Sequence, residues 1–176
     1  MQNAEFGIAV SPVGDGFKYN YESNNSTFGI KKEGGINMVK VRLMTINDWE
    51  SVEKVWKDHE GTNPVDDSEE GFTRYLKRNP TTSFVAEDDG KIIGTILAGH
   101  DGRRGIFHHV VVAPEYRKQG IGKMLVNSAA EALRKEDIHK VLLVVFTHNE
   151  NGNQFWEHMG FTERTDLVYR NKYIEI

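Results

Sequence analysis

The chain of 176 residues contains no cysteine. Disulfide bonds, thiolate nucleophiles and cysteine-ligated metals are therefore excluded, and the composition suits a reducing compartment. No apolar stretch approaches the roughly 18 consecutive residues that a membrane-spanning helix needs. The first thirty residues also lack a basic segment followed by an apolar core. We therefore expect a soluble, cytoplasmic protein that has no membrane partner.

The chain also has no surplus of positive charge: it contains 22 Lys and Arg and 26 Asp and Glu, which gives a net charge of -4. Proteins that bind nucleic-acid phosphates normally show a basic surplus or a basic stripe, so we predict no nucleic-acid partner. The acidic balance suits a cationic small substrate. We also expect no metal site, because no paired metal-ligand spacing connects His59, His100, His139, His148 and His158.

With 38% hydrophobic residues, a chain of this length can bury one good core, which predicts a single main domain. We place that domain at residues 38–176. Residues 1–37 are rich in glycine and form an N-terminal extension. Within it we predict a hairpin of residues 8–10 with residues 17–21, followed by a glycine linker at positions 34–35.

The periodicity of the main domain predicts a mixed, twisted sheet flanked by helices, an α/β (α+β) fold. Helices are expected at residues 47–59, 69–78, 117–136 and 151–159, and strands at 39–43, 83–87, 91–100, 106–112 and 140–146, with a final strand pair within 161–176. A right-handed crossover would lay the strand 140–146 parallel to the strand 106–112. Parallel neighbours joined by a helix form a ligand crevice at their C-terminal ends.

The stretch 110–125 contains an apolar strand, a turn and the start of a helix. The first N–H groups of a helix have no partner within it and lie at the positive end of its dipole, so they bind phosphate readily. Gly120 and Gly122 would let a ligand approach the backbone. Arg117 and Lys118 add positive charge, so we predict a pyrophosphate site here.

Two familiar glycine motifs do not fit this stretch. A Walker A loop needs a glycine five residues before its Gly-Lys pair, where Arg117 stands, and a Ser or Thr after it, where Met124 stands. A dinucleotide fingerprint needs a third glycine at position 125, which is Leu125. Both readings are therefore excluded.

The stretch instead resembles the acyl-CoA signature of the GNAT superfamily of N-acetyltransferases, Arg/Gln-x-x-Gly-x-Gly/Ala, here Arg117-Lys118-Gln119-Gly120-Ile121-Gly122. A second block follows the apolar run 141–145. Asn149 is followed seven residues later by the aromatic Trp156 and then by Gly160-Phe161, which matches the superfamily's order. The resemblance covers roughly residues 39 to 176.

This resemblance implies a mostly antiparallel GNAT-like sheet with a splayed parallel strand pair that forms the acyl-CoA crevice. It implies acetyl-CoA as cosubstrate and transfer of the acetyl group to a primary amine by direct attack. The amine would belong to a small molecule or a peptide. The residues implied to bind acetyl-CoA are Val110, Val112, Arg117, Lys118, Gln119, Gly120, Ile121, Gly122, Lys123, Asn149 and Trp156.

Catalytic groups are harder to assign. The glutamate that some members carry on this strand is replaced by Ile106, whereas the histidine of other members matches His108, which becomes the candidate base. Strand alternation would place His108 on one face with Val110 and Val112, and His109 on the other. Packing on a half-exposed sheet is the competing interpretation for both histidines.

Trp156 stands where many members carry a tyrosine acid, and an indole is a poor proton donor. Tyr169, Tyr173 or water are the candidate substitutes. For Asn149, an N-cap role is an equal alternative to cofactor binding. The replacement at Trp156 also keeps open a second function, an acyl-CoA-binding sensor or interaction module without turnover. The sequence does not identify the acceptor, and a homodimer stays open.

Overall fold

The computed structural model describes residues 19–20, 28–31, 38–57 and 59–174. Their strands form one sheet in sequence order. The strands are β1 (Tyr19–Asn20), β2 (Phe28–Lys31), β3 (Met38–Leu43), β4 (Phe84–Asp88), β5 (Lys91–His100), β6 (Gly105–Val112) and β7 (Val141–Leu143). The α-helices are α1 (Trp49–Trp56), α2 (Glu69–Arg78), α3 (Ile121–Lys135) and α4 (Glu150–His158), and two short 3₁₀ helices are η1 (Ile46–Asp48) and η2 (Pro114–Tyr116).

All neighbouring strands are antiparallel except β6 and β7, which are parallel. The predicted mixed, mostly antiparallel sheet is therefore confirmed, as is the crossover through α3. The strand predicted at 140–146 is shorter than expected, because β7 ends at Leu143 and pairs only with Gly105 to Phe107 of β6.

The described part of the N-terminal segment extends the sheet. Tyr19–Asn20 pairs with β2, and β2 pairs with β3 from Phe28 to Lys31. A strand was predicted around residues 17–21, and its described partner is β2. The predicted partner strand at 8–10 and the glycine linker at 34–35 lie outside the described residues.

Side-chain hydrogen bonds stabilise the beginnings of η1 and α2. Asp48 Oδ2 accepts a hydrogen bond from Thr45 N at 2.7 Å, so the predicted helix at 47–59 begins as η1 and continues as a shorter α1. At α2, Ser68 is the N-cap, and its Oγ accepts from Gly71 N at 3.1 Å. None of the helices in the described part of the chain combines the length and the apolar composition of a membrane span.

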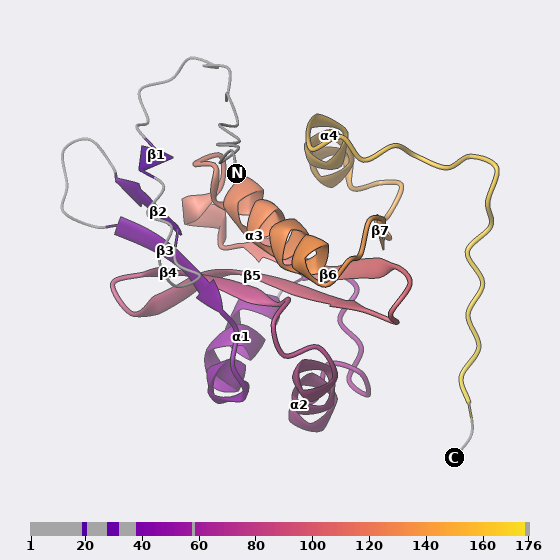
Figure 1. Cartoon of the computed structure of the whole chain (residues 1–176), viewed down its shortest axis with the longest axis horizontal. Coiled ribbons are helices and arrows are strands. Elements are labelled where there is room, and N and C mark those ends of the chain that lie inside the picture. The colour runs from indigo at the N-terminus through magenta and orange to yellow at the C-terminus, as the bar shows by residue number, and fades with distance from the viewer. Residues whose placement is uncertain (1–18, 21–27, 32–37, 58, 175–176) are drawn as a thin grey trace, which may run out of the picture.

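The two faces of the sheet carry two cores. Figure 1 shows α1 and α2 on one face and α3 and α4 on the other. On the α1/α2 face the buried side chains include those of Trp56, Phe72 and Val111. On the α3/α4 face the apolar side of α3 packs on the sheet through Ile121, Leu125, Val126, Ala129 and Leu133. The helix predicted at residues 117–136 is thus present as α3 and buries one side against the sheet.

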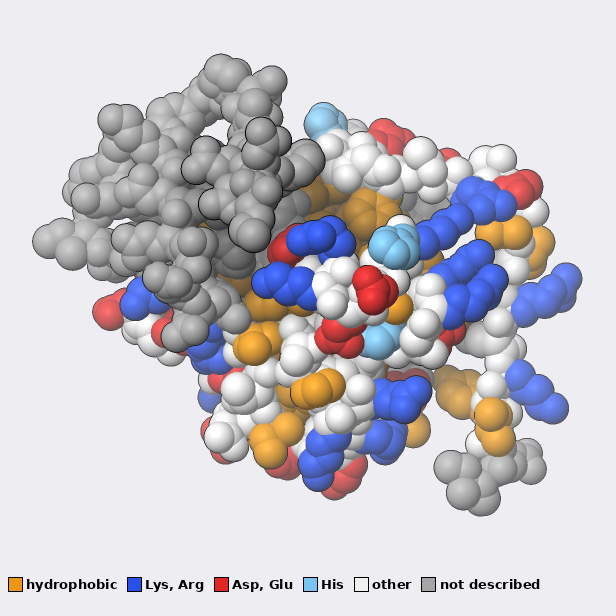
Figure 2. Space-filling model, in the orientation of Figure 1, with side chains coloured by type: hydrophobic (Ala, Val, Ile, Leu, Met, Phe, Trp, Pro, Cys, Tyr) orange, Lys and Arg blue, Asp and Glu red, His pale blue; other side chains and the backbone are white. Residues whose placement is uncertain are grey.

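The strand pair predicted within residues 161–176 is wrong for the described residues 161–174, which contain no strand. A strand exists only by pairing with a neighbour, and three-residue β7 offers few free backbone groups for that purpose. The segment instead extends from α4 away from the sheet (Figure 1). Several of its apolar side chains are exposed, as the orange atoms along it show (Figure 2), among them Leu167, Val168 and Ile174.

Candidate active site

The parallel strands β6 and β7 diverge after their last pair, Phe107 with Leu143. Strand β6 continues to Val112, whereas β7 has already ended. Residues 108–112 therefore have a strand neighbour only on the β5 side, and their other side is called here the open edge of β6. This is the splayed parallel pair that the GNAT resemblance implies.

Backbone groups of Val110 and Val112 face this open edge. Ala113 N donates to Ile93 O of β5 at 2.9 Å, and Val111 O lies 3.1 Å from the position of a Cβ built on Gly94 of β5. Backbone groups of successive residues in a strand point to alternate sides, so those of Val110 and Val112 point away from β5. In agreement, Val112 O accepts a hydrogen bond from Arg117 Nε at 2.9 Å.

The N-terminus of α3 follows directly after η2. Its N-cap is Gly120, whose φ of 82° lies in the left-handed region that only glycine adopts without cost. No side chain caps this end, so the first N–H groups of α3 stay available to a ligand. The exposed side chains of Arg117, Lys118 and Lys123 surround it.

Three further residues of the signature support this turn. Gln119 Nε2 donates to Glu115 O at 3.2 Å, which ties the turn to η2. Ile121 is buried in the core under α3, and a Cβ on Gly122 would lie 3.3 Å from Phe155 Cζ of α4. The signature residues thus come together at one end of α3, next to Val112, and present backbone N–H groups and cations suited to an anion.

A β-bulge changes the expected faces of β6. Leu97 pairs with His108 and Thr95 pairs with Val111, so His109 and Val110 together lie opposite Ile96. His109 has a φ of 45°. The prediction that His108 shares a face with Val110 and Val112, opposite His109, is therefore wrong. A bulge adds one residue to a strand and interrupts its alternation.

Both histidines contact the α1/α2 face. The ring of His108 lies edge-on to Tyr75 of α2, with centroids 6.0 Å apart, and the ring of His109 stacks on Trp56 of α1 at 4.2 Å. In contrast, Val110 and Val112 pack against the core on the α3/α4 face. The candidate base and the two valines implied to bind acetyl-CoA thus pack on opposite faces of the sheet.

His109 is part of a hydrogen-bonded network. Its Nε2 lies 2.7 Å from Asp67 Oδ1, and both side chains are largely buried, with 14% and 13% exposed. Thr95 Oγ1 donates to His109 O and accepts from Trp56 Nε1, both at 2.9 Å. Sequence reasoning missed this network, because His109 and Asp67 are 42 residues apart and no local pattern links them.

The imidazole of His108 is open to solvent on one side. Partial desolvation by the surrounding groups lowers its pKa below the usual 6.5, and the positive charge of His109 lowers that pKa further, while Asp67 and Asp66 oppose the shift. His108 is therefore held mainly as the neutral imidazole at pH 7, which is the form that can accept a proton. Burial raises the pKa of the neighbouring Tyr75 phenol, so that hydroxyl is a poor acid.

The second signature block lies at α4. Asn149 is the N-cap of α4, where its Oδ1 accepts from Gly152 N at 2.9 Å, which is the alternative role that its position suggested. Trp156 is buried with 9% of its surface exposed, and its ring packs among the rings of Phe107, Phe155 and Phe161. Trp156 thus belongs to the core.

The two candidate acids lie in the extended C-terminal segment. Tyr169 is 71% exposed and Tyr173 is 78% exposed. The structure therefore does not bring them together with His108 or with the N-terminus of α3. Among the described residues, no group of three or more His, Asp or Glu side chains is arranged to hold a metal ion.

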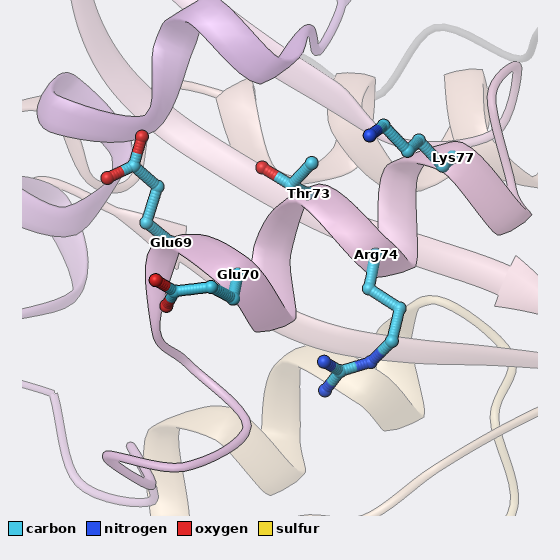
Figure 3. A pocket seen from close by; sticks show the side chains of 5 residues that line it. All are labelled: Glu69, Glu70, Thr73, Arg74 and Lys77. Carbon is cyan, nitrogen blue, oxygen red and sulfur yellow. The ribbon is translucent and has the colours of Figure 1, made fainter.

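A shallow hollow lies elsewhere, on the outer side of α2 (Figure 3). It is lined by Glu69, Glu70, Thr73, Arg74 and Lys77. All of these side chains come from one helix and carry charges of both signs, and neither β6 nor α3 contributes. The hollow is therefore separate from the place where the signature residues meet.

Comparison with known proteins identifies the family. Residues 46–161 match the acetyltransferase (GNAT) family. The chain belongs to this family. Acetyltransferase plu1384 of Photorhabdus laumondii subsp. laumondii is 30% identical over 126 residues, which make up 72% of this chain and 88% of that protein. The GNAT resemblance of the two signature blocks is thereby confirmed, and the protein is an N-acetyltransferase.

Two solved structures show the same fold. The PaiA N-acetyltransferase from Thermoplasma acidophilum, in complex with coenzyme A, has a TM-score of 0.63 and 23% identity, and the match covers 73% of this chain and 92% of that one. The AAC(6')-Iy structure, in complex with the bisubstrate analogue CoA-S-monomethyl-acetylneamine, has a TM-score of 0.60 and 18% identity, with 77% and 99% covered.

Proposed function

We propose that this GNAT acetyltransferase transfers the acetyl group of acetyl-CoA to a primary amine by direct nucleophilic attack. The observation that carries the proposal is the continuity of the site. The open edge of β6 leads, through Val112, to the uncapped N-terminus of α3. A strand edge suits the amides of a pantetheine arm, and a helix N-terminus suits a pyrophosphate.

In this proposal each end of acetyl-CoA has its own contacts. The N–H groups of Gly120, Ile121, Gly122 and Lys123 would bind the pyrophosphate, with the charges of Arg117, Lys118 and Lys123 around them and Gln119 holding the turn. The backbone of Val110 and Val112 would pair with the pantetheine amides. Asn149 would add a contact through its amide nitrogen, because its Oδ1 already caps α4.

The chemical step follows from these contacts. A backbone N–H of the open edge would donate to the thioester oxygen and stabilise the charge that develops there. The amine nitrogen attacks the carbonyl carbon, the C–N bond forms, and the C–S bond breaks as the CoA thiolate leaves. No covalent enzyme intermediate is needed, in keeping with a chain that has no cysteine.

His108 is the proposed general base. Its lowered pKa leaves it neutral near pH 7, so it can take the proton of the attacking amine directly or through one water. The thiolate also needs a proton. Since Tyr169 and Tyr173 are exposed in the C-terminal segment, we assign that proton to solvent.

The acceptor is proposed to be a cationic amine of a small molecule or a peptide. The negative charges of Asp66 and Asp67 oppose the lowering of the His108 pKa, so these charges act at the candidate base. The same charges would attract an ammonium group to this end of the α1/α2 face. In addition, the similar AAC(6')-Iy structure holds an analogue that joins CoA to an acetylated amine compound.

The test is thiol release from acetyl-CoA with a panel of amines that includes polyamines, aminoglycosides and peptide N-termini. We expect release of free CoA that requires one class of amine and matches the appearance of the acetylated product. The alternative is an acyl-CoA-binding sensor without turnover. Acetyl-CoA binding without release across the panel would favour that alternative, although its motivating residue, Trp156, lies in the core.

A further inference from the structure

We propose that His109 is a positioning residue whose side chain holds β6 in its bulged conformation, and that this conformation directs the Val110 and Val112 amides to the open edge. The inference rests on the proposed function, because the direction of these amides matters only if they bind acetyl-CoA. His109 itself faces Trp56 and Asp67, on the side of the sheet opposite the packing of Val110.

The backbone at His109 needs such support. Its φ of 45° lies in the left-handed region, where the Cβ atom of any residue other than glycine is crowded. The segment 108–112 also has no strand neighbour on its open edge to fix its register. A regular strand would therefore be the relaxed alternative for this segment, unless side-chain contacts favour the bulge.

Three contacts of His109 supply that preference. Its Nε2 bonds to Asp67 Oδ1 at 2.7 Å in a largely buried pair. Its ring stacks on Trp56 with an interplanar angle of 25°. Its carbonyl oxygen accepts from the hydroxyl of fully buried Thr95. The two side-chain contacts require the left-handed turn, since regular alternation without a bulge would place the His109 side chain on the other face of the sheet.

Asp67, the hydrogen-bond partner of His109, is itself held by two hydrogen bonds. Asp67 Oδ2 accepts from Asn63 N at 2.6 Å, and Asp67 N donates to Asn63 O at 2.8 Å. The carboxylate thus joins β6 to the connection between α1 and α2. Loss of the His109 side chain would break this connection. Relaxation of the bulge would then turn the Val110 backbone away from the open edge.

The experiment compares His109→Gly with His109→Ala. Both remove the imidazole, but glycine adopts a φ of 45° freely and alanine does not. If the side chain acts by holding the bulge, His109→Ala should weaken acetyl-CoA affinity at least about tenfold in calorimetry, whereas His109→Gly should stay within about threefold of the wild type. The Michaelis constant for acetyl-CoA should rise more in the alanine variant than in the glycine variant. Both variants lose the imidazole that lowers the pKa of His108, so any change in the pH profile of turnover should be the same in the two.

Asp89→Ala is the matched control, because Asp89 has a φ of 48° in an exposed hairpin turn. It should leave acetyl-CoA affinity unchanged. If His109→Ala fails to fold, Asp67→Asn provides the second test. It should weaken the same affinity, because it replaces the carboxylate that bonds to His109 Nε2 with a neutral amide, which is a weaker acceptor.

The possible results separate the two proposals. A wild-type protein that binds no acetyl-CoA would refute the proposed function. Wild-type binding that neither His109→Ala nor Asp67→Asn weakens would refute the positioning role alone. Equal losses in His109→Gly and His109→Ala would also overturn it, because the imidazole would then act directly rather than through the bulge.

Discussion

Trp56 lies almost flat against His109, with ring centroids 4.2 Å apart and an interplanar angle of 25°. Trp56 also donates its indole N–H to Thr95 Oγ1, which in turn donates to the carbonyl oxygen of His109. One side chain of α1 thus contacts the bulge of β6 directly through its ring, and its nitrogen is linked to the bulge through Thr95.

Trp56→Phe should keep much of the ring contact but remove the donor to Thr95. The hydroxyl of Thr95 is fully buried, so water does not replace the lost bond without cost. We expect the free energy of unfolding in urea to fall by about 1 to 3 kcal/mol. Trp49→Phe is the control, because Trp49 lies in the same aromatic cluster and is only partly buried. Equal losses in the two variants would mean that ring volume, and not the hydrogen bond, matters at Trp56.

His108→Ala should lower turnover by roughly 10²-fold to 10⁴-fold, which is about 3 to 5 kcal/mol in the barrier, with acetyl-CoA affinity nearly intact. Desolvation and the His109 charge lower the pKa of His108, so its base form persists below pH 6.5. Wild-type turnover should therefore fall as pH drops through the lowered pKa, at a lower pH than an unperturbed imidazole would give.

This fall in turnover at low pH should be missing from the pH profile of His108→Ala. Steady-state rates between pH 5 and pH 8, with a saturating amine, measure both profiles. Identical profiles for the two proteins would show that water or the backbone carries the proton, and would return His108 to a packing role.

Gly120→Glu should abolish acetyl-CoA binding, because a side chain and a negative charge would occupy the place of the pyrophosphate. Gly102→Glu is the matched control. Gly102 also has a left-handed φ, 87° against 82° for Gly120, and it lies in open space at the opposite end of β6. Calorimetry on both variants, with circular dichroism as a check of folding, should show binding only in the control. A folded Gly120→Glu that still binds would mean that the phosphate site is elsewhere.

Trp156→Ala should destabilise the fold by about 3 to 5 kcal/mol, since it would leave a cavity among three aromatic rings. Chemical denaturation with tryptophan fluorescence or circular dichroism measures this loss. The folded fraction should still bind acetyl-CoA. Unchanged stability together with lost binding would instead assign Trp156 to the cofactor, as the sequence alone suggested.

Much of the fold could be predicted, because its signals are local. The spacing of Ile121, Leu125 and Leu133 defines the buried side of α3, and Ser68 defines the beginning of α2. The lengths of β7 and of the C-terminal segment could not be predicted. Apolar alternation shows that residues can form a strand, but the pairing that makes a strand depends on a neighbour elsewhere in the chain.

The sequence by itself determined the end of α3 and the family. The glycines, the cations and the preceding strand lie within one short stretch, and the chemistry of a helix N-terminus needs nothing from the rest of the chain. Only the tertiary structure decided the faces of β6. The left-handed turn at His109 is disfavoured locally and is supported by Trp56 and Asp67, which reach it from distant segments, so no pattern within β6 could reveal it.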